Sequence, residues 1–382
     1  MASELPPLPI CDASSMRPPC QSQYLRVPIR YESCTDIGGR QLQAAIFSPS
    51  PQHPYAVVAH SSGASISMPD GPSPSTLTPT DVAALDRWAA AEKRYALVDT
   101  LRPEHLADLY ITLPTRDGAH GGGARGYAPP REGDELGYGH HLVFFHPRNP
   151  EKQLRWDGTD VDFSPPEPFK RRMWAGGRME WKRPLHVGDR AEAASTITSV
   201  EKKGFASGET GTPMVFVKQK LEYRKQGTGD VCVEEERSHV YLATAGSGRA
   251  AKEVKDLPKP DFTFECLPTP TTLFRFSALT FNGHYIHLDK EYAQKSEGYP
   301  ERLVHGPLTA LMLLDVTALK IPGRAFKTFE YRAVNPIPVN RRISIHGARE
   351  SEETIRVWAE AEELETGRLV VGMTGKITLT DV

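Results

Sequence analysis

The chain has 382 residues, of which 39% are hydrophobic and 25% are charged, and its formal net charge is −2. This length accommodates two or three domains. The small net charge gives no electrostatic basis for binding nucleic acid or an anionic membrane surface. No apolar run is long enough to span a bilayer, so we expect a soluble protein without a nucleic-acid or membrane partner.

The five cysteines contain no CxxC pair, which argues against both a disulfide framework and a structural zinc site. The first residues lack the basic and apolar regions of a secretory signal. Two early acidic residues, Glu4 and Asp12, are also atypical of a mitochondrial transit peptide. These residues therefore leave the cellular compartment open.

Residues 1–75 are rich in proline and serine, and we interpret them as an N-terminal extension. Two short apolar runs, 41–47 and 55–60, are candidate strands that faintly resemble the opening strands of an α/β-hydrolase. No GxSxG motif follows them anywhere in the chain. A hydrolase of that class is therefore excluded.

The pattern changes after Ser75, where Thr and Asp caps precede apolar residues at helical spacing. We expect two helices between residues 75 and 113. A glycine-rich stretch follows, over residues 117–135. It lacks the GK[ST] ending of a phosphate-binding loop, so we interpret it as a connecting loop.

Two later regions, 179–242 and 329–380, repeat one pattern of alternating β-type residues separated by short turns. The stretches PLHVGDR, from Pro184 to Arg190, and PIPVNRR, from Pro336 to Arg342, occupy the same place in each repeat. Each copy therefore predicts a proline-containing turn that leads into a three-stranded antiparallel meander.

Residues 307–320, PLTALMLLDVTALK, begin with a proline at the first helical position and have almost no polar face. They predict a buried helix covered by the second set of strands. A curved antiparallel sheet around a long helix is the hotdog arrangement. We therefore predict an α+β double hotdog, with one hotdog over residues 76–245 and the second over 246–382.

The start of the buried helix is a candidate site. The backbone N–H of Gly306 is among the first in the helix, where donors have no intrahelical partner and the dipole is positive. Such a donor stabilises negative charge on a thioester oxygen. The alternative is that Gly306 only allows a tight connection between loop and helix.

Several polar residues precede this helix in FNGHYIHLD, from Phe281 to Asp289. His287 has a side chain that accepts and returns protons near neutral pH. Asp289 reads as the N-cap of a short helix rather than as a catalytic carboxylate. Asn282 and His284 place further polar groups close to His287.

The combination TFNGHYIHLDKEYA, EGYP and LVHGPL resembles the MaoC-like hydratases and dehydratases. Within that group it is most similar to the type 2 hydroxyacyl-thioester dehydratases and to the C-terminal half of mesaconyl-CoA hydratases. The stretch PFKRRMWAGGRMEWKRPLHVGDR is similar to the N-terminal hotdog of the same group. The resemblance extends over residues 95–382.

This resemblance implies a hydro-lyase that dehydrates a (3R)-3-hydroxyacyl thioester or hydrates the corresponding enoyl thioester. Its substrate would be carried on coenzyme A or on acyl carrier protein, and no cofactor or metal would be needed. Alternatives are a hydratase of a short branched dicarboxylyl-CoA such as mesaconyl-CoA, a non-catalytic acyl-thioester-binding hotdog, and thioester hydrolysis. The resemblance also implies a mitochondrial location, with the cytoplasm as alternative, and a monomeric double hotdog or a homodimer.

Carried over residue by residue, the resemblance makes His287 the general acid/base and Gly306 the oxyanion donor. Asn282 stands where the general (R)-hydratase pattern has an aspartate, and we expect it to orient the water or hydroxyl group. His284 is a second acid/base or a substrate-holding residue. For His305 a supporting or substrate-binding role is expected.

Four residues of KRRMWAGGR are candidate substrate-binding residues: Arg171, Arg172, Trp174 and Arg178. The arginines fit phosphates of the carrier or a substrate carboxylate, and a solvated basic turn is the alternative. A further group, His140, His141 and His146, lies beside aromatic residues. We interpret it as lining the first hotdog or its acyl tunnel rather than as a zinc site, because no carboxylate or cysteine lies at ligand spacing.

Overall fold

The computed structural model describes residues 30–35, 41–46, 77–118, 127–161, 163–205, 212–243, 251–363 and 367–380. It divides into two units, Met1–Met68 and Pro69–Val382. In the first unit, β1 (Arg30–Thr35) and β2 (Gln41–Ile46) form an antiparallel pair. Strand β2 confirms the first of the two candidate strands of the extension. The second, 55–60, lies outside the described residues.

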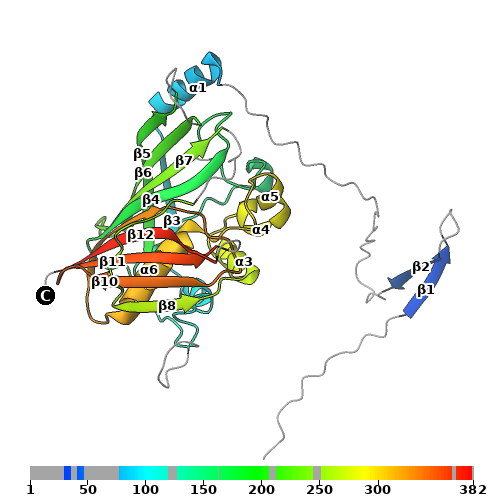
Figure 1. The fold of residues 1–382 in the computed structure, drawn as a ribbon. Helices are drawn as coiled ribbons and strands as arrows, with labels where there is room; N and C mark the ends of the chain where they lie inside the picture. The colour runs from blue at the N-terminus through cyan, green and yellow to red at the C-terminus, as the bar shows by residue number, and fades with distance from the viewer. Residues whose placement is uncertain are drawn as a thin grey trace, which may run out of the picture. The chain divides into compact units, whose positions relative to one another are not determined.

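The second unit is built on one ten-stranded antiparallel sheet, in the order β3-β5-β6-β7-β4-β9-β12-β11-β10-β8 (Figure 1). Its strands are β3 (Arg94–Thr100), β4 (Arg171–Trp181), β5 (Arg190–Lys203), β6 (Met214–Lys225), β7 (Val231–Leu242), β8 (Phe262–Cys266), β9 (Phe326–Ala333), β10 (Ile343–Arg349), β11 (Thr354–Glu362) and β12 (Leu369–Leu379).

The sheet order shows that the sequence repeat is a structural repeat. From its outer edge inward, the first half runs β3-β5-β6-β7-β4, and the second half runs β8-β10-β11-β12-β9 in the same relative order. The halves join where β4 pairs with β9, with Gly177 opposite Tyr331. Backbone hydrogen bonds therefore make the two curved sheets continuous, which is the double hotdog expected from the sequence.

The outermost strand of each half, β3 or β8, was not foreseen from the sequence. Along β3 no side chain is fully buried, so the strand lacks the apolar alternation that identifies a half-buried strand. It also lies between two helices, which explains why the stretch reads as helical. Edge strands of this kind are defined by their pairing partner, here β5.

The two helices expected between residues 75 and 113 are present as α1 (Pro79–Ala90) and α2 (Pro103–Tyr110). In α1 the side chains of Thr78 and Asp81 form a reciprocal capping box, which satisfies donors at the helix start. The remaining helices are α3 (Pro270–Leu279), α4 (Tyr285–Leu288), α5 (Lys290–Lys295), α6 (Gly306–Lys320) and the short 3-10 helices η1 (His140–Val143) and η2 (Glu151–Gln153).

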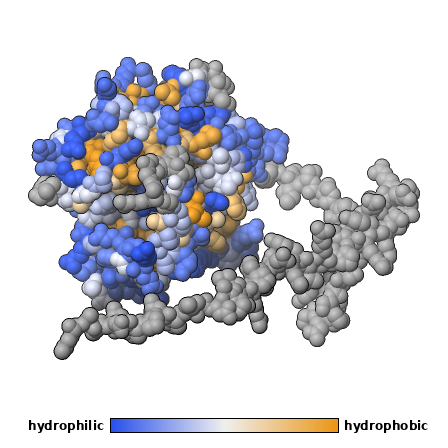
Figure 2. Space-filling view, turned by 90° about the horizontal axis from the view of Figure 1, so that it is seen from below, coloured by the Kyte–Doolittle hydropathy of each residue, from blue (hydrophilic) through white to orange (hydrophobic). Residues whose placement is uncertain are grey.

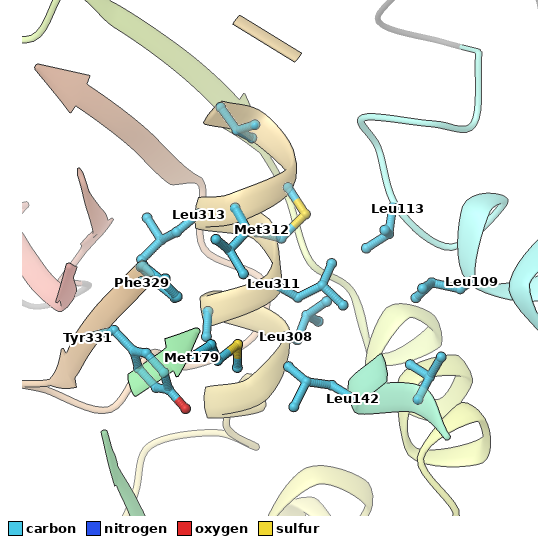
Figure 3. Close-up of a cluster of buried hydrophobic side chains, with 14 of the residues drawn as sticks. Leu109, Leu113, Leu142, Met179, Leu308, Leu311, Met312, Leu313, Phe329 and Tyr331 are labelled. Atoms are coloured by element: carbon cyan, nitrogen blue, oxygen red, sulfur yellow. The ribbon is translucent and has the colours of Figure 1, made fainter. Parts of the chain in front are cut away.

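Helix α6 is the central helix of the second half, and every residue from Leu308 to Thr317 is buried. It contacts β10, β11 and β12. Figure 3 shows its leucines between the sheet residues Phe329 and Tyr331 and the first-half residue Leu142. Leu319, in the last turn, is exposed. The predicted buried helix is therefore confirmed up to its last turn.

The first half fills the corresponding space differently. Between β3 and β4, the described residues form only the short α2, η1 and η2. Leu109 and Leu113, from α2 and the turn after it, pack toward α6 rather than along the first-half sheet (Figure 3). The expected central helix of the first half is thus short, because this segment closes the core of the other half.

The surface seen in Figure 2 is largely hydrophilic, with apolar patches between the charged residues. Among the described residues, no helix combines the length and the apolar character needed to cross a bilayer.

Candidate active site

A cavity of about 670 Å³ lies between the two halves of the double hotdog. Both halves contribute residues that were singled out from the sequence. Those predicted site residues that line the cavity are Arg172 and Trp174 from the first half and Asn282, His284, His287, His305 and Gly306 from the second. The structure therefore brings the histidine segment and the start of α6 together around one space.

His287, in α4, is held in one tautomer. Its Nδ1 lies 2.8 Å from the carbonyl oxygen of Leu303, and a carbonyl only accepts hydrogen bonds, so Nδ1 carries the proton. The lone pair is then on Nε2. Burial lowers the pKa of His287 to about 4, which keeps the imidazole neutral at physiological pH. This is the state that a general base requires.

His305, the N-cap residue of α6, stacks on His287 with 3.6 Å between ring centroids. Its Nε2 lies 2.9 Å from the hydroxyl of Ser277. Burial, followed by the neighbouring His287 and His284, holds the pKa of His305 well below its usual value. The neutral ring of His305 therefore packs against the ring of His287 and helps to hold its orientation.

Asn282 and His284 form a turn whose geometry is set by hydrogen bonds. The side-chain Oδ1 of Asn282 accepts the backbone N–H of His284 at 3.1 Å. The Nε2 of His284 is buried without a hydrogen-bond partner among the described residues, and lies 3.9 Å from Oδ2 of Asp157. Burial, followed by neighbouring positive groups, lowers the pKa of His284 well below its usual value.

Gly306 begins α6 in close contact with Trp174 of β4. A Cβ at residue 306 would lie 3.0 Å from both Cβ and Cγ of Trp174, closer than ordinary van der Waals contact. A Cβ at this position would therefore require Trp174 to shift, so glycine favours this packing as well as the approach of a ligand carbonyl. The two interpretations of Gly306 drawn from the sequence are compatible.

The three arginines of KRRMWAGGR have different surroundings, because neighbouring residues of β4 face opposite sides and the strand has a bulge between Trp174 and Gly176. Arg172 lines the cavity, whereas Arg171 and Arg178 are not among its lining residues. Arg171 is buried and forms an ion pair with Glu297. Arg178 pairs with Glu180 at 2.8 Å and with Glu330 at 3.4 Å. A substrate-binding role for Arg171 and Arg178 stays a prediction. Their ion pairs indicate that these two residues stabilise the structure around the site.

The histidines of GYGHHLVFFHP lie in three different environments. His140 approaches Asp315 of α6 at 3.3 Å, and His141 approaches Glu235 of β7 at 3.3 Å. His146 lines the cavity, as expected for a tunnel residue. No set of three metal-binding side chains occurs among the residues that the structure describes.

Asp157 and His239 are among the polar contributors to the site that come from the first half and were missed in the sequence. Asp157 lies in the turn WDGTD, whose Gly158 packs against Gly283 so closely that a Cβ would lie 2.2 Å from the Gly283 oxygen. His239 lies on β7 and lines the cavity. Neither carries a local signal, since each reaches the site through a contact between residues far apart in the chain.

Comparison with solved structures gives similar folds. HtdX of Mycobacterium tuberculosis superposes with a TM-score of 0.51 at 14% identity, covering 75% of this chain and 100% of that one. A MaoC-like dehydratase from Phytophthora capsici gives a TM-score of 0.50 at 16% identity, covering 79% and 99%. At these identities the likeness concerns the fold.

Comparison with known sequences gives relatives of higher identity. A mesaconyl-C(4)-CoA hydratase of Chloroflexus aurantiacus is 39% identical over 200 residues, covering 52% of this chain and 69% of the relative. The mitochondrial hydroxyacyl-thioester dehydratase type 2 of Schizosaccharomyces pombe is 32% identical over 231 residues, covering 54% and 76%. The family model for hydroxyacyl-thioester dehydratase type 2 matches residues 139–339, which include β4, the histidine segment and α6. The chain therefore belongs to the hydroxyacyl-thioester dehydratase type 2 family.

Proposed function

We propose that the protein catalyses the reversible addition of water to a 2-enoyl thioester at the start of α6. As a member of this family it is a hydro-lyase of acyl thioesters. The observation that supports the location best is the hydrogen bond from His287 Nδ1 to the Leu303 carbonyl. It leaves a neutral, proton-accepting Nε2 on the same cavity as the start of a buried helix.

In the hydration direction, His287 Nε2 takes a proton from water as the water oxygen bonds to C3. The π electrons of the C2–C3 bond move toward the thioester, and negative charge develops on its oxygen. The N–H of Gly306 donates to that oxygen at the positive end of α6. His287 then returns the proton to C2, and the electron pair of the enolate forms the new C–H bond.

One imidazole thus carries the proton both ways, so hydrogen and hydroxyl add to the same face of the substrate. The reverse sequence is a syn elimination of water from a 3-hydroxyacyl thioester. No redox change occurs, and each step conserves its protons. This scheme needs one base and one oxyanion donor, which are the two groups that the second half supplies.

The neighbouring polar groups have supporting roles in this proposal. Asn282 uses its Oδ1 for the turn, so its Nδ2 amide is the side that orients the water or hydroxyl group. His284, with an unpartnered Nε2, is the candidate for a second hydrogen bond to that oxygen. His305 holds the plane of the His287 ring by stacking.

The carrier is proposed to be coenzyme A or acyl carrier protein, because the relatives are named for acyl-thioester chemistry. For oligomeric state we propose a monomer. The β4–β9 pairing already joins two hotdogs within one chain, as two subunits would otherwise be joined. Light scattering coupled to gel filtration measures this directly, and a mass of two chains would contradict it.

The test of function follows the loss of enoyl-thioester absorbance when purified protein is mixed with crotonyl-CoA. We expect turnover by the wild type and a kcat/KM lower by about 1,000-fold for His287→Ala. Circular dichroism of the variant checks that the fold is retained. Equal rates for the two proteins would exclude His287 as the base, and no turnover with crotonyl-, mesaconyl- or longer enoyl-CoA would favour a binding role.

A further inference from the structure

The cavity wall formed by the first half carries polar side chains that the proposed hydration step does not use. They are Arg172 on β4, Ser195 on β5, Arg237 and His239 on β7, and His146 after η1. A plain hydrocarbon chain has no use for such groups. Their presence on one wall calls for a ligand with a polar part.

Three of these side chains hold polar atoms that are buried without a hydrogen-bond partner among the described residues. They are Nδ1 of His239, Oγ of Ser195 and Nε2 of His146. His239 is 8% exposed and Ser195 is 6% exposed, so bulk water does not replace the missing bonds. Buried polar atoms are nearly always satisfied in native proteins, and exceptions mark positions where a ligand supplies the bond.

Strand pairing places Arg172 beside His239. In the β4–β7 ladder Trp174 is opposite His239, and Arg172 is opposite Tyr241, two residues further on. All four line the cavity. Residues two positions apart on one strand face the same side of a sheet, so Arg172 and His239 are diagonal neighbours on the cavity wall.

The two arginines of this wall differ in whether a described carboxylate pairs with them. Arg237 is neutralised by Glu235, which its Nη2 approaches at 2.9 Å. Arg172, by contrast, forms no ion pair or hydrogen bond through its guanidinium with any described residue. Burial, followed by Arg172 and then Arg237, lowers the pKa of His239 well below its usual value. Arg172 is therefore a cation without an ion-pair partner among the described residues and has a neutral imidazole beside it, while the carboxylate of Asp160, which also lines the cavity, accepts a hydrogen bond from Asn149.

The position of Arg172 decides between two anions that it could bind, which are the diphosphate of coenzyme A and a carboxylate of the acyl group. On β4 Arg172 lies two residues from Trp174, whose side chain packs on Gly306, so it lies near the reacting end of the substrate. The diphosphate of coenzyme A is separated from the thioester by the whole pantetheine arm. An anion that meets Arg172 while the thioester meets Gly306 therefore belongs to the acyl group.

We propose that Arg172 and His239 bind a carboxylate on the acyl group, so that the preferred substrate is an enoyl thioester with a second, free carboxylate close to its double bond. Arg172 forms the ion pair, and His239 donates a hydrogen bond to the same group. Ser195 and His146 form hydrogen bonds to the remaining polar atoms of the acyl group, directly or through water. This inference rests on the proposed function and specifies its substrate class.

The test compares crotonyl-CoA with two carboxylated analogues, mesaconyl-C(4)-CoA and glutaconyl-CoA, whose carboxylates lie on C3 and C4. The readout is the ratio of kcat/KM between carboxylated and plain substrate. We expect the wild type to prefer one carboxylated substrate by about 100-fold, because a buried ion pair is lost with crotonyl-CoA. Arg172→Met removes the charge at similar volume and should abolish this preference.

Arg183→Met is the matched control, since Arg183 forms an exposed ion pair with Asp230 outside the cavity lining. It should leave the preference as in the wild type, whereas His239→Phe should reduce it. Turnover of crotonyl-CoA without a preference for either carboxylated substrate would overturn the inference and leave the hydro-lyase in place. A preference that survives Arg172→Met would overturn it as well. No turnover of any of the three by the wild type would overturn the proposed function and the inference with it.

Discussion

The two halves of the double hotdog share a strand order but fill their concave faces with different material. In the second half, α6 lies against β10, β11 and β12, and its side chains are buried through Thr317. In the first half, α2 and η1 are short, and Leu97, Leu142 and Leu221 line an open cavity instead. A repeat that gives up its central helix thereby gains the volume to hold an acyl group.

The chemical groups divide in the same way. The second half holds the proposed base and the helix start, and the first half holds Arg172 and the buried polar atoms of His146, Ser195 and His239 that lack a hydrogen-bond partner among the described residues. Each half is incomplete alone, because α6 also packs on Leu109, Leu113 and Leu142 of the first half. The two halves therefore share a core, and the proposed base and the proposed carboxylate-binding residues lie in different halves.

The largest effect is expected when one histidine of each half is replaced in turn and the activities of the two variants are compared. His287→Ala should lower kcat/KM by about 1,000-fold, because the proton carrier is lost. His186→Ala, at a partly exposed histidine of the first half, should leave kcat/KM unchanged. Enoyl-CoA absorbance measures both. Similar losses in the two variants would remove the distinction between the halves.

The core shared by the two halves should lose stability when the buried carboxylate of Asp315 has no cation beside it. Asp315 of α6 is bonded to Thr115, Arg116 and His140 of the first half. Replacing Arg116 by Met would leave the Asp315 carboxylate without its cation, at a cost of about 3 kcal/mol in the free energy of unfolding. Urea denaturation measures this. Arg183→Met, at an exposed ion pair with Asp230, is the control and should cost much less.

The pH dependence of Asp315 follows from the same contacts. Arg116 and His140 outweigh the effect of burial and hold its pKa well below the usual value. The folded state therefore binds this proton less readily than the unfolded state. Its contribution is fully present above the unfolded pKa of about 4 and is lost as the pH falls below that. Urea denaturation between pH 3 and 7, compared with Arg116→Met, should show a weaker acid dependence in the variant.

The junction between the halves is tested at Gly306. Gly306→Ala would place a Cβ 3.0 Å from Trp174 of the first half, so either the Trp174 side chain or the start of α6 must shift by a few tenths of an ångström. We expect kcat to fall by about 100-fold, because a small displacement of an oxyanion donor has a large effect. Steady-state kinetics with KM measured separately test this. A lower melting temperature with unchanged kcat would assign Gly306 to packing alone.

The smallest expected effect is the dependence of kcat/KM on pH, which reports on His287 as the proton carrier. Burial lowers the pKa of His287 to about 4, below the value near 6.5 of an unfolded histidine. The imidazole thus stays neutral, and kcat/KM should be nearly constant from pH 8 to 5. The stability that this group contributes is complete above about pH 6.5 and is lost gradually toward pH 4, since the unfolded state takes up the proton first. An acid limb of kcat/KM centred near pH 6.5 would contradict the buried assignment.

Much of the fold was readable from the chain because its signals are local. The apolar run 307–320 specified a buried helix, and two alternating regions specified the repeated strands. The outer strands β3 and β8 were not readable, because their hydrogen bonds to β5 and β10 define them. The site followed the same division. The FNGHYIHLD segment was found, whereas His239 and Asp157 were missed.

The sequence by itself determined the two strand repeats, the central helix of the second half and the histidines that precede it, since periodicity and helix-start residues act over a few positions. Only the tertiary structure decided which of three neighbouring arginines faces the cavity, how His287 is oriented, and which side chains of the first half face the site. Those outcomes depend on strand alternation, register and burial, as in the pairing of Arg172 with Tyr241 and the hydrogen bond between His287 and Leu303. A local sequence pattern does not specify which residues become partners in such contacts.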